Sequence, residues 1–211
     1  MLQDTGERII PDRMKPTNGM LLEHIARYYF AAPYVKGRVL DISCGVGYGT
    51  QMIAKMCKKD METAVGVDID GNALDYARGR YHHPLIEWVQ ADALDPELPK
   101  RLGTFDTILS FETIEHLADD HLFITHLQSM LKPDGLLILS TPFGRGRGEP
   151  TNEPFHVHQL TPVEFKALFG SFSSVEFYNQ RGVTFEPPRS GVHYAFGVAV
   201  AKNEQKIFDE L

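Results

Sequence analysis

The residues best placed to do chemistry are a glycine-rich turn and a carboxylate that follows it. An apolar run ending at Ile42 leads into Ser43-Cys44-Gly45-Val46-Gly47-Tyr48-Gly49, where a helical pattern opens. Glycine permits unusual backbone conformations and lets a ligand approach closely. About 20 residues further on, Asp68 ends a second apolar run, where it can accept hydrogen bonds from a ribose. Asp68 could instead cap the next helix, but Asp70 is available for that, so the pattern favours a ribose-containing ligand.

The glycine spacing and the local charge distinguish between two such ligands. A dinucleotide requires G-x-G-x-x-G, whereas Gly45 and Gly47 are followed by Thr50 at the third glycine position. The ends of the apolar runs also carry acids, which disfavour a pyrophosphate and suit a ligand with sulfonium and ammonium groups. We therefore predict S-adenosylmethionine (SAM), with S-adenosylhomocysteine as its product, over NAD. The clustered acids are Asp41, Asp68, Asp92 and Glu112.

Three histidines near the expected carboxyl ends of the fourth and fifth strands are candidate catalytic residues. His116 follows Glu115, and His156 and His158 lie in a loop that precedes a helix capped by Thr161. A histidine there can act as a general base on an acceptor hydroxyl. The alternative is a histidine whose ring is satisfied by backbone groups. We expect no metal ion, because no third ligand follows His156-x-His158 at a convincing spacing.

The elements that must position these residues alternate between strands and helices from Gly37 onward. Continuously apolar strands of this kind are typical of a parallel sheet covered on both faces, and the alternation predicts a doubly wound α/β fold. A long glycine- and charge-rich loop is expected over 142–159. The predicted strands are 38–42, 63–67, 86–89, 105–111, 136–140, 172–178 and 192–201, and the predicted helices are 50–58, 72–80, 119–131 and 161–169.

The first 36 residues form a separate segment that precedes the main domain at 37–211. A helix is expected to begin after Thr17 or Asn18 and to end at Pro33, with an apolar stripe on one face. One role for it is a packing helix whose stripe covers the sheet. Residues 5–11 and 23–31 resemble a segment of bacterial methyltransferases associated with glycan assembly, and this resemblance implies a lid that turns Arg8, Arg13 or Tyr28 toward the cofactor or acceptor. The stripe consists of Leu22, Ile25, Ala26, Tyr29 and Phe30.

Residues 37–141 resemble the class I SAM-dependent methyltransferases, segment by segment. Ser43 departs from the pattern, since glycine or alanine is more usual at that position. The resemblance implies a Rossmann-like sheet of about seven strands in the order 3-2-1-4-5-7-6, with the last strand antiparallel. The segments that carry it are 41–47, 66–70, 91–93, 105–116 and 131–136.

The resemblance also implies a role for each matching position. Gly45 and Gly47 would pack against the methionine part of SAM, and Asp68 would hold the ribose. Ile69 would lie on the adenine face, and Asp92 would accept from the adenine amino group. His116 would have a positioning role near the cofactor. The predicted cofactor-binding residues are Asp41, Gly45, Gly47, Asp68, Ile69, Asp92, Ala93, Phe111 and Glu112.

Composition narrows the function classes. The chain has 211 residues, 43% of them hydrophobic and 23% charged, which suits one globular domain. Its start is unlike a signal peptide and no window matches a membrane span, so we expect a cytoplasmic protein without a membrane partner, either monomer or homodimer. The two cysteines are expected to be free thiols. A net charge of −7 makes nucleic acid an unfavourable partner.

These observations predict an enzyme that transfers a methyl group from SAM to a small molecule or a sugar or glycan precursor, with oxygen favoured as the acceptor atom. One alternative is methylation of nitrogen, or of a macromolecule such as tRNA or protein. Ser110-Phe111-Glu112-Thr113 disfavours it, because planar nitrogen targets often go with an Asn-Pro-Pro-Tyr-like tetrad in relatives. A second alternative is a SAM-binding regulatory module without catalysis.

Overall fold

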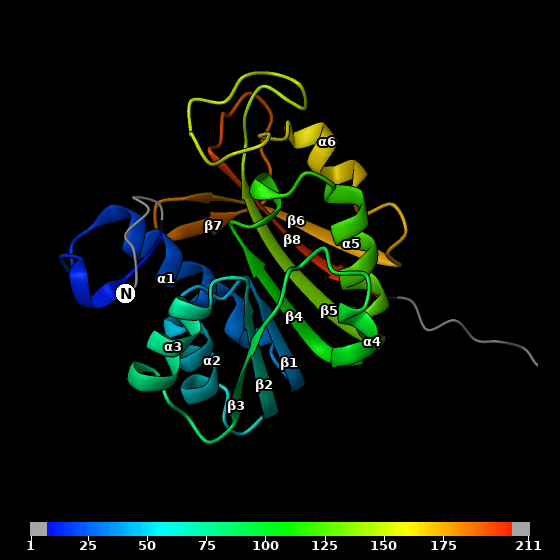
Figure 1. The fold of residues 1–211 in the computed structure, drawn as a ribbon. Coiled ribbons are helices and arrows are strands. Elements are labelled where there is room, and N and C mark those ends of the chain that lie inside the picture. The colour runs from blue at the N-terminus through cyan, green and yellow to red at the C-terminus, as the bar shows by residue number, and fades with distance from the viewer. Residues whose placement is uncertain (1–7, 204–211) are drawn as a thin grey trace, which may run out of the picture.

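The computed structural model describes residues 8–203, which form a single mixed β-sheet flanked by helices (Figure 1). The strand order is β3-β2-β1-β4-β5-β8-β6-β7. The first five strands are parallel, and β8 runs antiparallel to both β5 and β6. The strands are β1 (Gly37–Ile42), β2 (Met61–Asp68), β3 (Ile86–Gln90), β4 (Phe105–Phe111), β5 (Leu131–Pro142), β6 (Ser174–Arg181), β7 (Thr184–Glu186) and β8 (Phe196–Lys202).

The predicted sheet order is confirmed, and one short strand is added to it. β7 pairs with β6 across a tight hairpin in which Arg181 lies opposite Thr184. Gly182 has a φ of +56° in this two-residue loop, as hairpin turns of matching twist require. The sequence analysis missed β7 because three residues are too few for an apolar alternation to stand out.

Helices cover both faces of the sheet, so two cores form. α1 (Gly19–Ala31), α2 (Tyr48–Met56) and α3 (Gly71–Arg80) pack on one face, and α4 (Leu98–Leu102), α5 (Asp120–Ser129) and α6 (Pro162–Ala167) pack on the other (Figure 1). β1 shows how one strand serves both cores: Leu40 and Ile42 belong to one and Val39 to the other. Short 3₁₀ turns occur at Pro11–Arg13, Ala32–Tyr34 and Ile114–His116.

Side-chain caps explain where several helices begin. Asn18 accepts from the Leu21 backbone amide, and Asp70 accepts from that of Asn72. Thr161 and Glu164 form a reciprocal capping box at α6. These caps confirm Asn18, Asp70 and Thr161 as the starts of the predicted helices.

The predicted stripe of the first helix is buried only in part. Ala26 is buried, and Ile25 and Phe30 pack against the core, but Leu22 and Tyr29 are 37% and 61% exposed. The helix also buries Leu21, Tyr28 and Ala31, together with the cation Arg27. The sequence offers two apolar faces, and the one that can place Arg27 beside buried polar partners is the one that packs.

Two further features are the state of the cysteines and the apolar character of the helices. Cys44 and Cys57 are free and buried, as expected. Among residues 8–203, no helix combines the length and apolar character that crossing a bilayer requires.

The contact between α1 and α2 generates a stability prediction. A Cβ atom at Gly49 would lie 1.9 Å from Cζ of Tyr28, so Gly49→Ala forces the helices apart. Overpacking of this kind should lower the free energy of unfolding by about 1–3 kcal/mol or more. Gly79→Ala is the matched control, because a Cβ there meets nothing within 4 Å on an exposed helix face. It should raise stability by about 0.5–1 kcal/mol. Urea unfolding measures the free energy of unfolding of both variants. Equal changes in the two variants would contradict the close contact between α1 and α2.

Candidate cofactor and acceptor site

The turn between β1 and α2 is an open cradle built on left-handed backbone. Ser43, Gly45 and Gly47 have φ values of 60°, 58° and 81°. A Cβ at Gly45 would point into open space, whereas one at Gly47 would lie 2.4 Å from the ring of Trp88. Gly45 therefore leaves room for a ligand, and Gly47 is needed for packing against Trp88.

Asp68 ties this turn to the end of β2. Its Oδ2 accepts from the Gly45 backbone amide at 2.8 Å, and its Oδ1 accepts from the Asp70 amide at 2.9 Å. An ionised carboxylate offers about four acceptor positions, so both oxygens retain capacity for the hydroxyls of a ribose. Burial raises the pKa of Asp68, while these two backbone amides oppose the shift. Asp68 lies at the end of β2 beside the glycine-rich turn, and its role as the ribose ligand stays a prediction.

The residues expected around the adenine lie at the neighbouring strand ends. Ile69 is 65% exposed, which is unusual for isoleucine and suits a side chain that a planar ligand covers. Asp92 is exposed and accepts from the Leu94 backbone amide at 2.9 Å, while Ala93 beside it is buried. Arg8 reaches the same edge and pairs with Asp70 at 2.6 Å. Residues 1–7 lie outside the described part of the chain.

Asp41 is 2% exposed, so it lies beneath the cradle and does not line its open side. It accepts from the Thr50 hydroxyl at 2.5 Å and from the Tyr28 hydroxyl at 3.3 Å. Burial raises the pKa of Asp41 to about 7, against the opposing effect of these hydrogen bonds, and nearby Asp68 adds to the rise. Tyr28 is thus placed near the cradle, as the lid hypothesis for the first helix expects, but it is buried.

Glu112 begins the acceptor side of the site at the end of β4. Its φ of +50° is rare for a residue with a side chain and marks local strain. Its carboxylate accepts from the Ser140 hydroxyl at 2.7 Å and lies 3.6 Å from the Arg27 guanidinium. Phe111 beside it is buried and packs edge-on against Tyr28.

Arg27 is a site residue that the sequence analysis missed. It is 1% exposed, donates to Gln180 at 2.7 Å and lies 4.7 Å from the ring centroid of Phe196. It lies in the middle of an apolar helix, and its partners are Glu112 just after β4, Gln180 in β6 and Phe196 in β8. No local pattern in the sequence indicates that this arginine is buried.

The structure brings two of the three predicted histidines together. The rings of His116 and His156 are 4.9 Å apart, and His116 Nδ1 lies 3.0 Å from the carbonyl oxygen of Phe155. Burial, and then the neighbouring His116, lowers the pKa of His156. His158 lies apart from them: it is 6% exposed and its Nε2 is 3.6 Å from Asp120.

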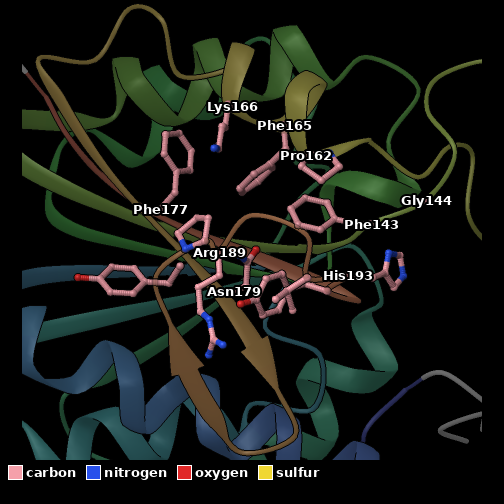
Figure 2. Close-up of a pocket in the computed structure, with 13 residues that line it drawn as sticks. Phe143, Gly144, Pro162, Phe165, Lys166, Phe177, Asn179, Arg189 and His193 are labelled. Atoms are coloured by element: carbon pink, nitrogen blue, oxygen red, sulfur yellow. The ribbon is translucent and has the colours of Figure 1, made fainter.

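A cavity of about 240 Å³ lies between α6, β6 and the loop that joins β7 to β8 (Figure 2). Aromatic rings form its walls, and Figure 2 shows Phe165 and Phe177 facing the space with Lys166 and Arg189 near its rim. Gly144 lines it too, and a Cβ there would meet Gln159, whose amide contacts His156 at 3.1 Å. The cavity is therefore linked to the histidines and separate from the cradle.

The sequence of this chain matches those of known proteins. Residues 40–139 fit the model of a methyltransferase domain family. A ubiquinone biosynthesis O-methyltransferase of Azorhizobium caulinodans is 31% identical over 200 residues, which cover 86% of this chain and 76% of the relative. The chain belongs to the class I SAM-dependent methyltransferases. SAM is the methyl donor that gives this family its name, and the carboxylates and the open space at Gly45 fit its cationic methionine end and its ribose.

Two more matches define the extent of the likeness. A probable SAM-dependent methyltransferase of Mycobacterium tuberculosis is 36% identical over 169 residues. That match covers 78% of this chain but 58% of the relative, so this chain spans less than two thirds of the mycobacterial protein. The N-methyltransferase NodS of Bradyrhizobium japonicum, solved with S-adenosylhomocysteine, has a TM-score of 0.65 at 18% identity, with 90% of each chain covered. This last likeness concerns the fold alone.

The burial of Asp41 generates a prediction about pH. Its pKa rises from 3.8 to about 7 on folding, so the folded protein retains a proton that the unfolded chain has lost. The resulting stabilisation is complete below about pH 4 and disappears as the pH rises through 7. Asp41→Asn keeps an acceptor for Thr50 and carries no charge. It should raise the free energy of unfolding by a few kcal/mol at pH 8, at about 1.4 kcal/mol per pKa unit, and change it little at pH 4.

Urea unfolding of both proteins at pH 4, 6 and 8 measures this difference. A gap between them that widens with pH supports a buried, protonated Asp41. A gap that stays constant would show that the carboxyl titrates at its ordinary pKa.

Proposed function

We propose that this chain transfers the methyl group of SAM to an oxygen atom of a small molecule or a glycan precursor. The observation that carries the proposal is the bond from the Gly45 amide to Asp68 beside open space, at the edge where Asp92 and Glu112 also gather. This arrangement presents carboxylates to a ligand that carries a sulfonium, an ammonium and a ribose.

Methyl transfer from SAM is an in-line displacement at carbon. A bond forms between the acceptor oxygen and the methyl carbon, and the carbon–sulfur bond breaks with its electron pair remaining on sulfur. The hydroxyl proton passes to water. Because the donor is already activated, the protein mainly contributes alignment, which is worth up to about 7–11 kcal/mol. The backbone around Phe111 and Glu112 is proposed to fix the sulfur end.

Oxygen is favoured by the residues around the acceptor side. His116, just after β4, contacts the ring of His156 from the loop before α6, and both are proposed to bind the reacting group of the acceptor. His158 is proposed to have a structural role, because it contacts the Asp120 carboxylate that Arg147 holds at 2.6 Å. The match to an O-methyltransferase points the same way. The cavity in Figure 2 is proposed to hold the far end of the acceptor.

One experiment distinguishes the proposed function from its alternatives. The fold does not select the acceptor atom, because the solved neighbour NodS is named an N-methyltransferase. A regulatory module that binds SAM without turnover would share the same cradle. We propose incubating the protein with SAM labelled on its methyl group and with a cell extract separated into small molecules and glycans, protein, and nucleic acid.

Label in the small-molecule or glycan fraction supports the proposal. Label in protein or nucleic acid contradicts the acceptor class, and absence of S-adenosylhomocysteine from every fraction contradicts catalysis. At a limiting concentration of labelled SAM, Asp68→Ala serves as the reference with reduced transfer in the same assay.

The cradle also predicts a change in SAM affinity. Asp68→Ala removes a charge-assisted hydrogen bond to the ribose, worth about 1.5–3 kcal/mol, so SAM should bind at least about tenfold more weakly. Asp75→Ala is the matched control, because that aspartate is 77% exposed on α3 and its ion pair within residues 8–203 is with Arg78 of the same helix. Titration calorimetry measures both variants. Equal affinities for SAM would show that Asp68 is not the ribose ligand.

A further inference from the structure

We propose that Glu115, His116 and His156 bind a divalent transition-metal ion. Each offers one ligand atom, and the three atoms lie within 4.8 Å of one another. Two imidazoles and one carboxylate are a ligand set that suits ions such as Zn²⁺, Fe²⁺ or Co²⁺ and leaves coordination positions open. The role assigned to the ion below rests on the proposed methyl transfer, whereas the site itself does not.

The backbone holds the three residues together from two distant segments. Glu115 and His116 belong to the 3₁₀ turn after β4, and His156 belongs to the loop over 142–161. The amide of Val157 donates to the carbonyl oxygen of Glu115 at 2.8 Å, which fixes the loop beside the turn. Ligands of a tetrahedral ion with bonds of about 2.1 Å lie roughly 3.4 Å apart, so closing on an ion takes a contraction of about 1 Å.

The hydrogen bonds of His116 prepare it to be a ligand. Its Nδ1 lies 3.0 Å from the carbonyl oxygen of Phe155, which only accepts, so Nδ1 carries a proton. In the neutral ring, Nε2 then presents a lone pair, and it faces Oε1 of Glu115 at 4.0 Å. This separation is too long for a hydrogen bond, and two electron-rich atoms facing each other favour a cation between them. Support of one ring nitrogen by a backbone carbonyl is typical of metal-bound histidine.

The other two ligands are held in a similar way. Glu115 is 1% exposed, and its Oε2 accepts from the Thr141 hydroxyl at 3.0 Å, which leaves Oε1 turned toward His116. Gln159 Nε2 lies 3.1 Å from His156 Nδ1, so in this orientation Nδ1 accepts and Nε2 carries the ring proton. Binding an ion at Nε2 requires the Gln159 amide to turn over, so that its oxygen accepts from Nδ1–H and leaves the Nε2 lone pair for the ion. Burying a carboxylate here is costly unless a cation compensates it. The nearby Glu112 is already engaged by Ser140 and Arg27, so Glu115 is the carboxylate left for the ion.

The position of the ion suggests its function. Glu115 and His116 follow Glu112 on the next turn of chain, where the sulfur end of SAM is proposed to lie. An acceptor hydroxyl bound at an open position would lose its proton to water more readily, because the ion stabilises the alkoxide. The alkoxide oxygen then bonds to the methyl carbon as the carbon–sulfur bond breaks. The ion would take the place of a general base, and both histidines would serve as its ligands.

The test uses Co²⁺ as the probe, because its visible absorption reports coordination by nitrogen and oxygen. The full chain is purified, stripped with EDTA and titrated with Co²⁺ in the absence of SAM and acceptor. We expect binding of about one ion per chain. His156→Ala should weaken it by at least about 100-fold, because loss of a ligand costs no less than the 10–100-fold seen for supporting residues. His121→Ala, which removes a 72% exposed histidine from α5, should leave it unchanged.

Failure of the native chain to bind Co²⁺, or equal binding by the native chain and His156→Ala, would overturn the site. Because His156 lies in a loop, circular dichroism of the variant separates ligand loss from unfolding. The catalytic role has its own test in the labelled-SAM assay: EDTA treatment should abolish transfer and Co²⁺ should restore it. Full transfer by the stripped protein would refute that role, while an inactive native protein that binds Co²⁺ would refute the proposed function and leave the site standing.

Discussion

The site depends on one hydrogen bond, from the Gly45 backbone amide to the carboxylate of Asp68. It can form only because Ser43, Gly45 and Gly47 adopt left-handed backbone, which turns the chain sharply between β1 and α2. The bond fixes the turn against the end of β2 and leaves carboxylate capacity directed outward. The parallel sheet then brings the ends of β3 and β4 to the same edge, which is where open α/β sheets bind ligands.

The first helix connects this cradle to the acceptor side. Its Tyr28 contacts Asp41 beneath the cradle, and the next residue toward the N-terminus, Arg27, reaches Glu112 and Gln180. One helix therefore contributes to both halves of the site through adjacent buried side chains. The charge of Arg27 offsets that of Glu112 in the interior, where an unpaired charge would be costly.

Features encoded locally could be predicted from the sequence. The glycine turn, Asp68 and the parallel strands leave short-range signals, and the structure places each of them as expected. The acceptor side could not be read in this way. Arg27 is buried only because β6 and β8 supply Gln180 and Phe196, which are more than 150 residues away in sequence.

The histidines illustrate the same limit. A search for metal ligands that looks downstream of His156 and His158 finds no third member, whereas the fold supplies Glu115 and His116 from 40 residues upstream. The first helix shows a different difficulty. Apolar residues lie on two of its faces, and periodicity alone cannot decide between Tyr28 and Tyr29; the partners across the sheet decide it.

The most direct measurement is a crystal structure of the protein with S-adenosylhomocysteine. The account predicts that both ribose hydroxyls contact Asp68, with the adenine between Ile69 and Asp92 and the sulfur directed toward Glu112. A ligand whose ribose is bound elsewhere, or one that lies in the cavity lined by Phe165 and Phe177, would contradict it.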